Sequence, residues 1–323
     1  MIDALGREGH FVDHLLPVWL ALPPEVRGTF YVSKLRDGVP GMSRGLPPPS
    51  SNPTLVASIG DLRTARRGGR PVALMEHGCG QSFGGDPRSA FSASYAGGAG
   101  RDAQLFLHPG EHPAARDRAA YPKARVEVVG CAKLDGLPRK ERSDRPVVAV
   151  AFHWDCRVSP ETRSAAREFQ DQVERLANEM TVIGHGHPRI LRRLTGWYRR
   201  MHVETVETFA EVCARADLYV NDASSTLFEF ASTGRPVVVL NPRHYRRSID
   251  HGLRFWEAST VGVNVGERDD LVEAVRLALE DPSEQQAERE RCVDIVYAYR
   301  TGAAERAAAV LMDWAGVRSL VAA

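Results

Sequence analysis

Residues 216–240 read ADLYVNDASSTLFEFASTGRPVVVL, and this segment places a short helical pattern between two apolar, strand-like runs. The run 218–220 predicts a buried strand, and residues 236–240 predict a second one. Ser225 begins the predicted helix, and Gly234 ends it because glycine readily adopts the backbone conformation that follows a helix. The segment therefore predicts a strand–helix–strand unit of a parallel sheet.

Polar side chains follow the first of these strands. Asp222, Ser224, Ser225 and Thr226 lie where the strand ends and the helix begins. The amino end of a helix carries roughly half a positive charge and suits a diphosphate. Glu229 follows one turn later, where its carboxylate can accept hydrogen bonds from ribose hydroxyls. The pattern predicts a nucleotide site, and the alternative is an ordinary strand–helix–strand unit with a serine N-cap.

The same alternation of strands and helices runs along the chain. Further strands are predicted at residues 29–32, 54–57, 71–75, 105–107, 126–129, 147–152 and 180–183. Helices are predicted at residues 11–22, 61–67 and 269–279, with others opening at Ser159 and at the capping box 283–286, and loops at 40–53 and 78–100. Short apolar strands separated by helices predict an α/β fold with parallel sheets covered on both faces.

The length of 323 residues is long for one hydrophobic core and suits two. A polar stretch at residues 137–145 is the expected interdomain linker. The predicted divisions are a Rossmann-like acceptor-side domain (1–136), the linker (137–145), a Rossmann-like nucleotide-donor domain (146–282) and C-terminal helices (283–323). Whether these last helices cross back to the first domain is left open.

Composition restricts the classes of function. The formal net charge of +1 gives no reason to expect a protein that wraps a polyanion. The five cysteines include no C-x-x-C pair, so neither a zinc knuckle nor a disulfide framework is expected. No apolar run approaches the roughly 20 residues needed to span a bilayer. We expect a cytoplasmic protein without stable membrane insertion, and peripheral membrane contact and a phage origin stay open.

Histidines follow two other predicted strands. His77 comes after the strand 71–75, and flexible glycines follow it, so it can act as a base near neutral pH. His185 and His187 come after the strand at 180–183, and no nearby cysteine or carboxylate completes a metal site with them. We therefore expect no metal. Arginines gather at 189–200 and 243–247, either as solvated helix faces or as contacts for an anionic ligand.

These residues resemble the GT-B fold transferases, and most closely the CDP-glycerol glycerophosphotransferases. The 216–240 segment matches the donor-binding pattern of that family at Asp222, Ser224, Ser225, Glu229, Gly234 and Pro236, with Ala223 where the family has an aromatic residue. The resemblance implies two facing Rossmann-like domains with a donor cleft between them. It extends over about residues 70–245.

Other elements match in the same order. Glu76-His77-Gly78 is similar to the His-Gly element of the family, whose histidine is a proposed catalytic base, although the following residues 79–82 differ. His187-Pro188 is similar to a His-Pro element, and residues 151–155, with Trp154, resemble a loop beneath the donor phosphates. Residues 129–135 resemble an element before the linker. The resemblance implies that His77 activates the acceptor and that His187 steadies phosphate charge, with His185 as a substitute.

The expected function is transfer of a sugar or of glycerol phosphate from a nucleotide-activated donor to an acceptor hydroxyl, without a cofactor. Donor contacts are expected from Asp222, Ser224, Ser225, Thr226, Glu229, His185 and Trp154. A nucleotide-sugar 2-epimerase and a non-catalytic nucleotide-binding protein are the alternatives. The acceptor, which could be a glycan polymer, a protein or a nucleic acid, is left open, as is a homodimer.

Overall fold

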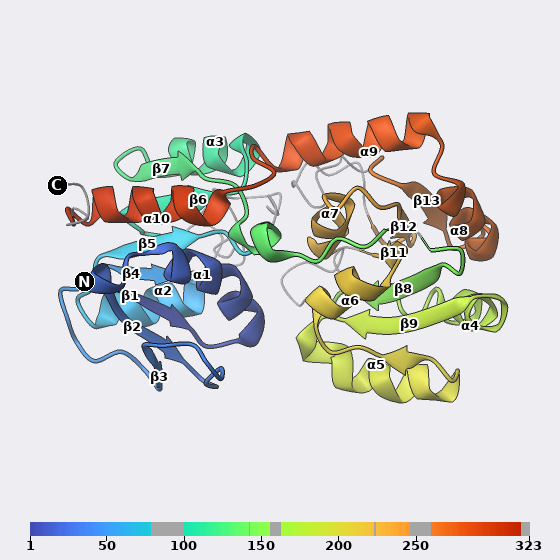
Figure 1. The fold of residues 1–323 in the computed structure, drawn as a ribbon, viewed down its shortest axis with the longest axis horizontal. Helices are drawn as coiled ribbons and strands as arrows, with labels where there is room; N and C mark the ends of the chain where they lie inside the picture. The colour runs from blue at the N-terminus through green and yellow to red at the C-terminus, as the bar shows by residue number, and fades with distance from the viewer. Residues whose placement is uncertain (79–99, 142, 156–162, 223, 246–259, 318–323) are drawn as a thin grey trace. The chain divides into compact units, whose positions relative to one another are not determined.

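The computed structural model describes residues 1–78, 100–141, 143–155, 163–222, 224–245 and 260–317. The chain divides into two compact units (Figure 1). Unit 1 comprises Met1–Gly136 with Val296–Ala323, and unit 2 comprises Leu137–Ile295. Each unit contains one sheet in which every pair of neighbouring strands is parallel. The α/β fold predicted from the sequence is confirmed.

The sheet of unit 1 has the strand order β3-β2-β1-β4-β5-β6-β7. Its strands are β1 (Ile2–Gly6), β2 (Arg27–Val32), β3 (Met42–Arg44), β4 (Thr54–Val56), β5 (Val72–Met75), β6 (Leu105–His108) and β7 (Arg125–Val128). The chain builds outward from β1 to β3 and then returns to the other side of β1 with β4. This reversal is the switch point of a doubly wound sheet.

Helices cover both faces of this sheet. They are α1 (Gly9–Ala21), α2 (Ile59–Arg67), α3 (Glu111–Ala120) and α10 (Ala303–Trp314), with short 3-10 turns η1 (Pro24–Val26) and η3 (Ala132–Gly136). α1 and α10 pack together in one hydrophobic cluster that also contains Ala73 and Met75 of β5. α2 packs in a second cluster with Leu74 of the same strand. The side chains of β5 therefore alternate between the two faces.

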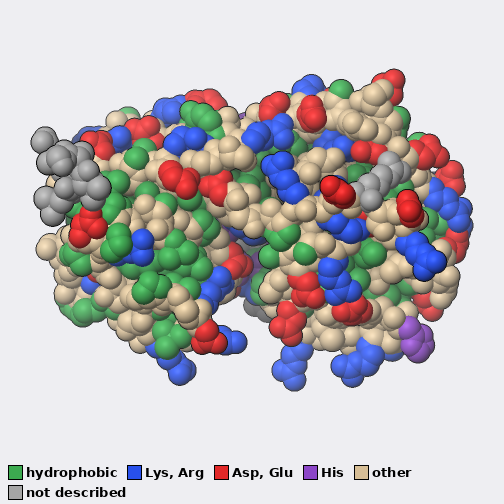
Figure 2. Space-filling model, in the orientation of Figure 1, with side chains coloured by type: hydrophobic (Ala, Val, Ile, Leu, Met, Phe, Trp, Pro, Cys, Tyr) green, Lys and Arg blue, Asp and Glu red, His purple; other side chains and the backbone are tan. Residues whose placement is uncertain are grey.

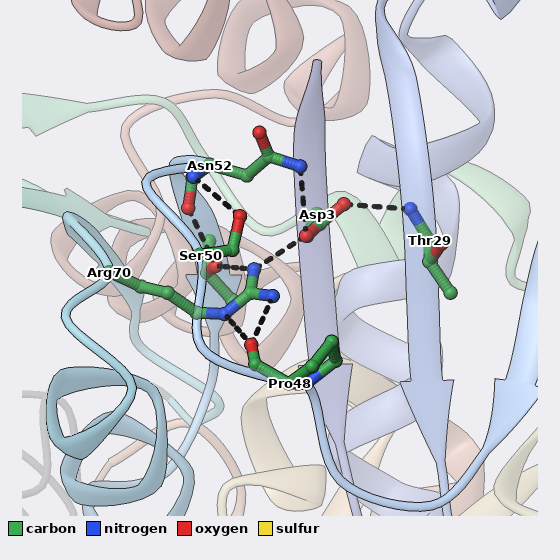
Figure 3. A network of polar contacts seen from close by, with 7 residues as sticks. Asp3, Thr29, Pro48, Ser50, Asn52 and Arg70 are labelled. Carbon is green, nitrogen blue, oxygen red and sulfur yellow. Dashed lines mark hydrogen bonds and ion pairs between the residues drawn. The ribbon is translucent and has the colours of Figure 1, made fainter.

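A buried ion pair in unit 1 joins β1 to the loop between α2 and β5 (Figure 3). Asp3 accepts hydrogen bonds from Arg70 Nη1, from Thr29 N at 2.8 Å and from Asn52 Nδ2 at 3.3 Å. Arg70 also donates to the carbonyl of Pro48. The side chains of Asp3 and Arg70 are 3% and 1% exposed, so the pair satisfies two charges that would be costly to bury alone.

The sheet of unit 2 has the strand order β10-β9-β8-β11-β12-β13. Its strands are β8 (Val147–Phe152), β9 (Thr181–Gly186), β10 (Glu204–Thr205), β11 (Leu218–Asn221), β12 (Val237–Asn241) and β13 (Val263–Gly266). The switch point lies between β8 and β11. Before β8, the linker is held to this unit by Asp217, which pairs with Lys140 and accepts hydrogen bonds from the backbone N–H groups of Ser143 and Val147.

The helices of unit 2 are α4 (Gln170–Glu179), α5 (Pro188–Arg200), α6 (Phe209–Arg215), α7 (Thr226–Ala231), α8 (Leu271–Glu280) and α9 (Ser283–Val296). α4, α5 and α8 bury their apolar residues in one cluster with alternate side chains of β8. α6 contacts β9, and α7 contacts β11 and β12. The helix α7 is short because Gly234, with φ of 86°, turns the chain towards β12 soon after it.

Several elements differ from the sequence predictions. β1 was not predicted, β3 lies inside the predicted loop 40–53, and β13 and the helices α3, α5 and α6 were missed. The helix expected from Ser159 begins only at Gln170, after residues 163–169 that are not helical. Ser159 itself lies outside the described residues, as does most of the predicted loop 78–100.

Candidate functional site

The carboxyl edge of the unit 2 sheet carries most of the predicted site residues. β8 lies between β9 and β11, at the point where the strand order reverses. Ligands of open α/β sheets bind at the carboxyl ends of strands beside such a switch point. His153 and Trp154 follow β8, His187 follows β9, and Asp222 follows β11.

Asp222 joins two loops at this edge. Its carboxylate accepts hydrogen bonds from His153 N at 2.7 Å and from Ala165 N at 3.0 Å, one on each oxygen. The residue is 0% exposed. Both oxygens thus accept hydrogen bonds from backbone amides, and Asp222 fixes the chain that carries His153 and Trp154. The direct donor contact expected from the sequence stays a prediction.

The serines of the 216–240 segment lie half-buried where α7 begins. Ser225 is the N-cap residue of α7, although its side chain makes no capping hydrogen bond. Asn221 Oδ1 accepts a hydrogen bond from Ser224 N at 3.1 Å, which shapes the turn between β11 and the helix. Thr226 Oγ1 lies 2.9 Å from Tyr219 Oη. Ala223 lies outside the described residues.

Glu229 is buried inside unit 2. It is 1% exposed, and its Oε1 accepts a hydrogen bond from Ser225 Oγ at 3.4 Å. Its contact with Ser225 orients the hydroxyl of that serine. The contact with ribose hydroxyls expected from the sequence stays a prediction.

His187 belongs to a cluster of rings. Its ring centroid lies 5.4 Å from that of His153 and 5.9 Å from that of Trp154. The guanidinium of Arg189 lies over the Trp154 ring, 4.5 Å from its centroid. His187 is the N-cap of α5, and its Nδ1 accepts a hydrogen bond from Arg189 N at 3.2 Å. The proton of neutral His187 is therefore assigned to Nε2.

His185 lies in a different environment from His187. It is 7% exposed, and its Nδ1 lies 3.0 Å from the carbonyl oxygen of Val206, so this nitrogen is the donor. Its own carbonyl accepts a hydrogen bond from Tyr198 Oη at 2.9 Å. The structure thus places His185 in the packing between β9 and its neighbours, with its ring centroid 6.4 Å from that of Phe209.

The arginines of α5 have defined contacts. Besides Arg189 on Trp154, Arg193 pairs with Asp155 at 3.1 Å, and Arg200 donates to the carbonyl of Gly196. Arg193 is more than half exposed, so its ion pair adds little to stability. These contacts fit a solvated helix, with Arg189 as the member that reaches the ring cluster. Arg246 and Arg247 lie outside the described residues.

His77 follows β5 in unit 1, at the carboxyl edge of that sheet. Its half-buried ring meets the Phe11 ring at 4.7 Å between centroids and at 79°. The rings of His10 and His14 lie 6.3 and 6.4 Å away. Burial lowers the pKa of His14 well below its ordinary value, and the positive charges of Lys133, His77 and His10 lower it further. Residues 79–82 lie outside the described residues.

Two residues of these clusters had no role in the sequence analysis. His153 was quoted in residues 151–155 without a function, and His14 was placed only within a predicted helix. The place of His153 and His14 in these clusters is visible only once the strand order has brought the loops and helices together. Within the residues that the structure describes, no cluster of histidine, cysteine and acidic side chains could hold a metal ion. Over the same residues, no helix has the length and apolarity to cross a membrane.

Comparison with protein families agrees with this picture. Residues 157–311 match the model of the family described as CDP-Glycerol:Poly(glycerophosphate) glycerophosphotransferase. The match indicates a transferase and confirms the resemblance inferred from the sequence. A comparison with curated proteins found no match.

Solved structures are similar over nearly the whole chain. The wall teichoic acid polymerase TagF has a TM-score of 0.62 at 12% identity, with 98% of this chain and 89% of that chain covered. MnaA of S. aureus, solved with UDP, has a TM-score of 0.64 at 12% identity, with coverage of 98% and 97%. UDP-GlcNAc 2-epimerase from Neisseria meningitidis has a TM-score of 0.58 at 13% identity, with coverage of 97% and 98%. These likenesses show the fold, which is of the GT-B type.

Proposed function

We propose that this chain transfers a glycerol phosphate group from CDP-glycerol to an acceptor hydroxyl. The observation that carries the proposal is the family match over residues 157–311. This segment includes His187, Ser224 and Ser225, which lie after adjacent or nearby strands at the carboxyl edge of the unit 2 sheet. TagF, one of the structural neighbours, was solved with CDPG in its H444N variant.

The proposed reaction is a displacement at phosphorus. The acceptor oxygen forms a bond to the phosphorus that carries glycerol, and the bond from this phosphorus to the bridging oxygen of the donor breaks. CMP leaves, and the acceptor hydroxyl gives its proton to His77, the candidate base. A histidine suits this role because its ordinary pKa lies close to neutral pH.

The donor side of the proposal uses hydroxyl and imidazole donors. Half-buried Ser224 donates a hydrogen bond to a diphosphate oxygen, and half-buried Ser225 does the same once its hydroxyl turns from Glu229 to the donor. His187 donates through Nε2, because Nδ1 is engaged with Arg189 N. Donors aimed at the departing phosphate stabilise the charge that develops there. No metal ion or other cofactor takes part in this scheme.

The remaining predicted residues support the donor site. Asp222 and Glu229 position the loop after β8 and the hydroxyl of Ser225 through the hydrogen bonds described above. Thr226 is held by Tyr219, and His185 acts through packing. The Trp154 ring, stacked with Arg189, offers a platform for the donor nucleoside.

Transfer of a sugar from a nucleotide-sugar would use the same donor contacts. Nucleotide-sugar 2-epimerase activity is the second candidate, since structures of such enzymes share the fold at similar TM-scores. A non-catalytic nucleotide-binding protein is the third. In each case the protein is proposed to act in the cytoplasm or at a membrane surface.

A nucleotide screen followed by a turnover assay tests the proposal. CDP-glycerol, UDP-, GDP- and TDP-sugars are compared by thermal unfolding, where a ligand at 100 times its Kd stabilises the fold by about 2.7 kcal/mol. CMP release from CDP-glycerol is then measured for wild type and His77→Gln. We expect CDP-glycerol to stabilise both proteins and only wild type to release CMP. Stabilisation by UDP-GlcNAc with formation of its 2-epimer would replace the proposal with the second candidate.

A further inference from the structure

Glu76 and His77, the two residues that follow β5, lie on opposite faces of the unit 1 sheet. Along β5, Ala73 and Met75 lie in the hydrophobic cluster of α1, and Val72 and Leu74 lie in the cluster of α2. His77 continues the first set, since its ring packs on Phe11 of α1. Glu76 continues the second set. The peptide between Glu76 and His77 thus links the candidate base to the other side of the sheet.

Glu76 ends a buried chain of alternating charges. His108 Nδ1, at the end of β6, lies 2.7 Å from Glu76 Oε2. His108 Nε2 lies 2.9 Å from Asp117 Oδ2 of α3, in an ion-pair contact that is not aligned as a hydrogen bond. Arg101 Nη1 lies 3.0 Å from both oxygens of Asp117. These four side chains are between 0% and 7% exposed.

The contacts of His108 favour its charged form. Burial alone would lower the pKa of this imidazole, but its contacts with Asp117 and Glu76 raise the pKa above the ordinary value of 6.5. An imidazolium carries a proton on each nitrogen, so His108 can face both carboxylates as a cation, with its hydrogen bond to Glu76 made through Nδ1. Asp117 also accepts hydrogen bonds from Arg101, so each carboxylate lies beside a cation. Opposite charges at these distances restrict where the buried side chains can lie.

We propose that His108 is a positioning residue, which fixes the Glu76 carboxylate and thereby sets the direction of the His77 imidazole on the opposite face of the sheet. The inference rests on the proposed function in one respect, namely that His77 is the base. Asp117 and Arg101 hold His108 in turn. Glu76 is thereby anchored to the strand beside its own through its side chain, in addition to the backbone hydrogen bond that its N–H donates to the carbonyl of Leu107 at 3.0 Å.

Three variants test this role. Glu76→Ala removes the anchor, Glu76→Gln keeps an acceptor for His108, and His108→Gln keeps a neutral hydrogen-bonding group in place of the imidazolium. Asp3→Asn is the matched control, since it disturbs another buried ion pair of unit 1, in which Asp3 at the start of β1 contacts Arg70.

The first readout does not depend on turnover. The ring signals of His77 are followed by proton–carbon NMR, with His77→Gln for assignment. They report the orientation of its ring against Phe11, whose ring current shifts them. We expect Glu76→Ala and His108→Gln to move these signals, Glu76→Gln to restore most of the wild-type shift, and Asp3→Asn to leave them in place.

The second readout is CMP release from CDP-glycerol. A misplaced base should lower kcat on the order of 100-fold and leave KM nearly unchanged. Unmoved His77 signals in folded Glu76→Ala and His108→Gln would overturn the positioning role. If wild type does not turn over CDP-glycerol, the proposed function fails on its own, and the NMR comparison still decides whether His108 positions His77. Should His108→Gln not fold, the two Glu76 variants give the same decision.

Discussion

The His187 side chain accepts a hydrogen bond from Arg189 N through Nδ1, so it caps α5 with one nitrogen and presents the other. Substitution can separate the two roles. His187→Asn keeps an N-cap acceptor, since asparagine is among the best N-cap residues, and removes the imidazole. His187→Ala removes both. The two variants therefore differ in the stability of α5, and both lack the imidazole that would act on the donor.

We expect His187→Ala to lose about 1 kcal/mol of unfolding free energy and His187→Asn to stay close to wild type. Both should lose most CMP release from CDP-glycerol. Urea unfolding and the turnover assay measure the two effects separately. Full activity in His187→Asn would show that capping is the sole role of this residue.

At this scale, the sequence identified residue types at the right strand ends but not what each side chain contacts. Asp222 and Glu229 fit a ligand-binding pattern, yet both are buried with partners inside unit 2. Their partners are His153 N, Ala165 N and Ser225 Oγ. A backbone amide from another loop leaves no trace in the sequence. The contacts that these two carboxylates make within unit 2 could therefore not be predicted, and their expected contacts with the donor stay a prediction.

Among the elements, β9 depends on a close approach between its backbone and α5. A Cβ on Gly184 would lie 2.4 Å from the Tyr198 ring, whose hydroxyl donates to the carbonyl of Val150 at 2.8 Å. No side chain fits there without moving this ring. The ring in turn holds β8 and β9 together beneath the candidate donor site.

Gly184→Ala should therefore destabilise unit 2 by about 1–3 kcal/mol through overpacking. Gly196→Ala in the neighbouring α5 is the control, because a Cβ at Gly196 meets no heavy atom within 4 Å. This second change should stabilise the helix by up to about 1 kcal/mol. We expect the urea midpoint of Gly184→Ala to lie below that of wild type and the midpoint of Gly196→Ala to lie above it. Equal midpoints for the two variants would show that the Tyr198 ring does not exclude a Cβ at Gly184.

The elements that the sequence predicted are those with continuous apolar runs, such as β8, β11 and β12. β1 was missed because Asp3 interrupts its apolar pattern and charged residues follow it, and only the pairing with Arg70 makes Asp3 a core residue. β3 and β13 were missed because edge strands are partly exposed and carry polar residues. Whether β1, β3 and β13 form strands is decided by their pairing with distant segments of the chain rather than by their local sequence pattern.

Over the whole molecule, charges of both signs are interspersed on the face shown in Figure 2. This distribution agrees with the net charge of +1. Inside unit 1, the pKa values of two buried histidines are shifted in opposite directions. The pKa of His14 is lowered by burial and by neighbouring positive charge, and the pKa of His108 is raised by its carboxylate partners against the effect of burial.

These shifts predict how stability changes with pH. His14 binds fewer protons folded than unfolded, so its contribution is complete above pH 6.5 and is lost as the pH falls through its lowered pKa. His108 binds more protons folded, so its contribution is complete below pH 6.5 and is lost as the pH rises through its raised pKa. The unfolding free energy of unit 1 should therefore decline on both sides of about pH 6.5.

Urea titrations between pH 5.5 and about pH 8.5 check this expectation, in the range where histidines titrate. His108→Gln should flatten the alkaline side of the curve, and His14→Gln the acid side. A wild-type curve that is flat over this range, or variants that change the wrong side, would contradict the assigned directions.

A calorimetric titration of CDP-glycerol into wild type and two variants tests whether the serines of unit 2 hold the donor diphosphate. Ser224→Ala combined with Ser225→Ala removes both proposed phosphate donors, and Thr64→Ala on α2 of unit 1 removes a hydroxyl that bonds Gly60 O instead. The account predicts saturable binding to wild type and to Thr64→Ala, and at least tenfold weaker binding to the double variant, which corresponds to about 1.4 kcal/mol. Equal affinity in all three proteins, or no binding of CDP-glycerol to wild type, would contradict it.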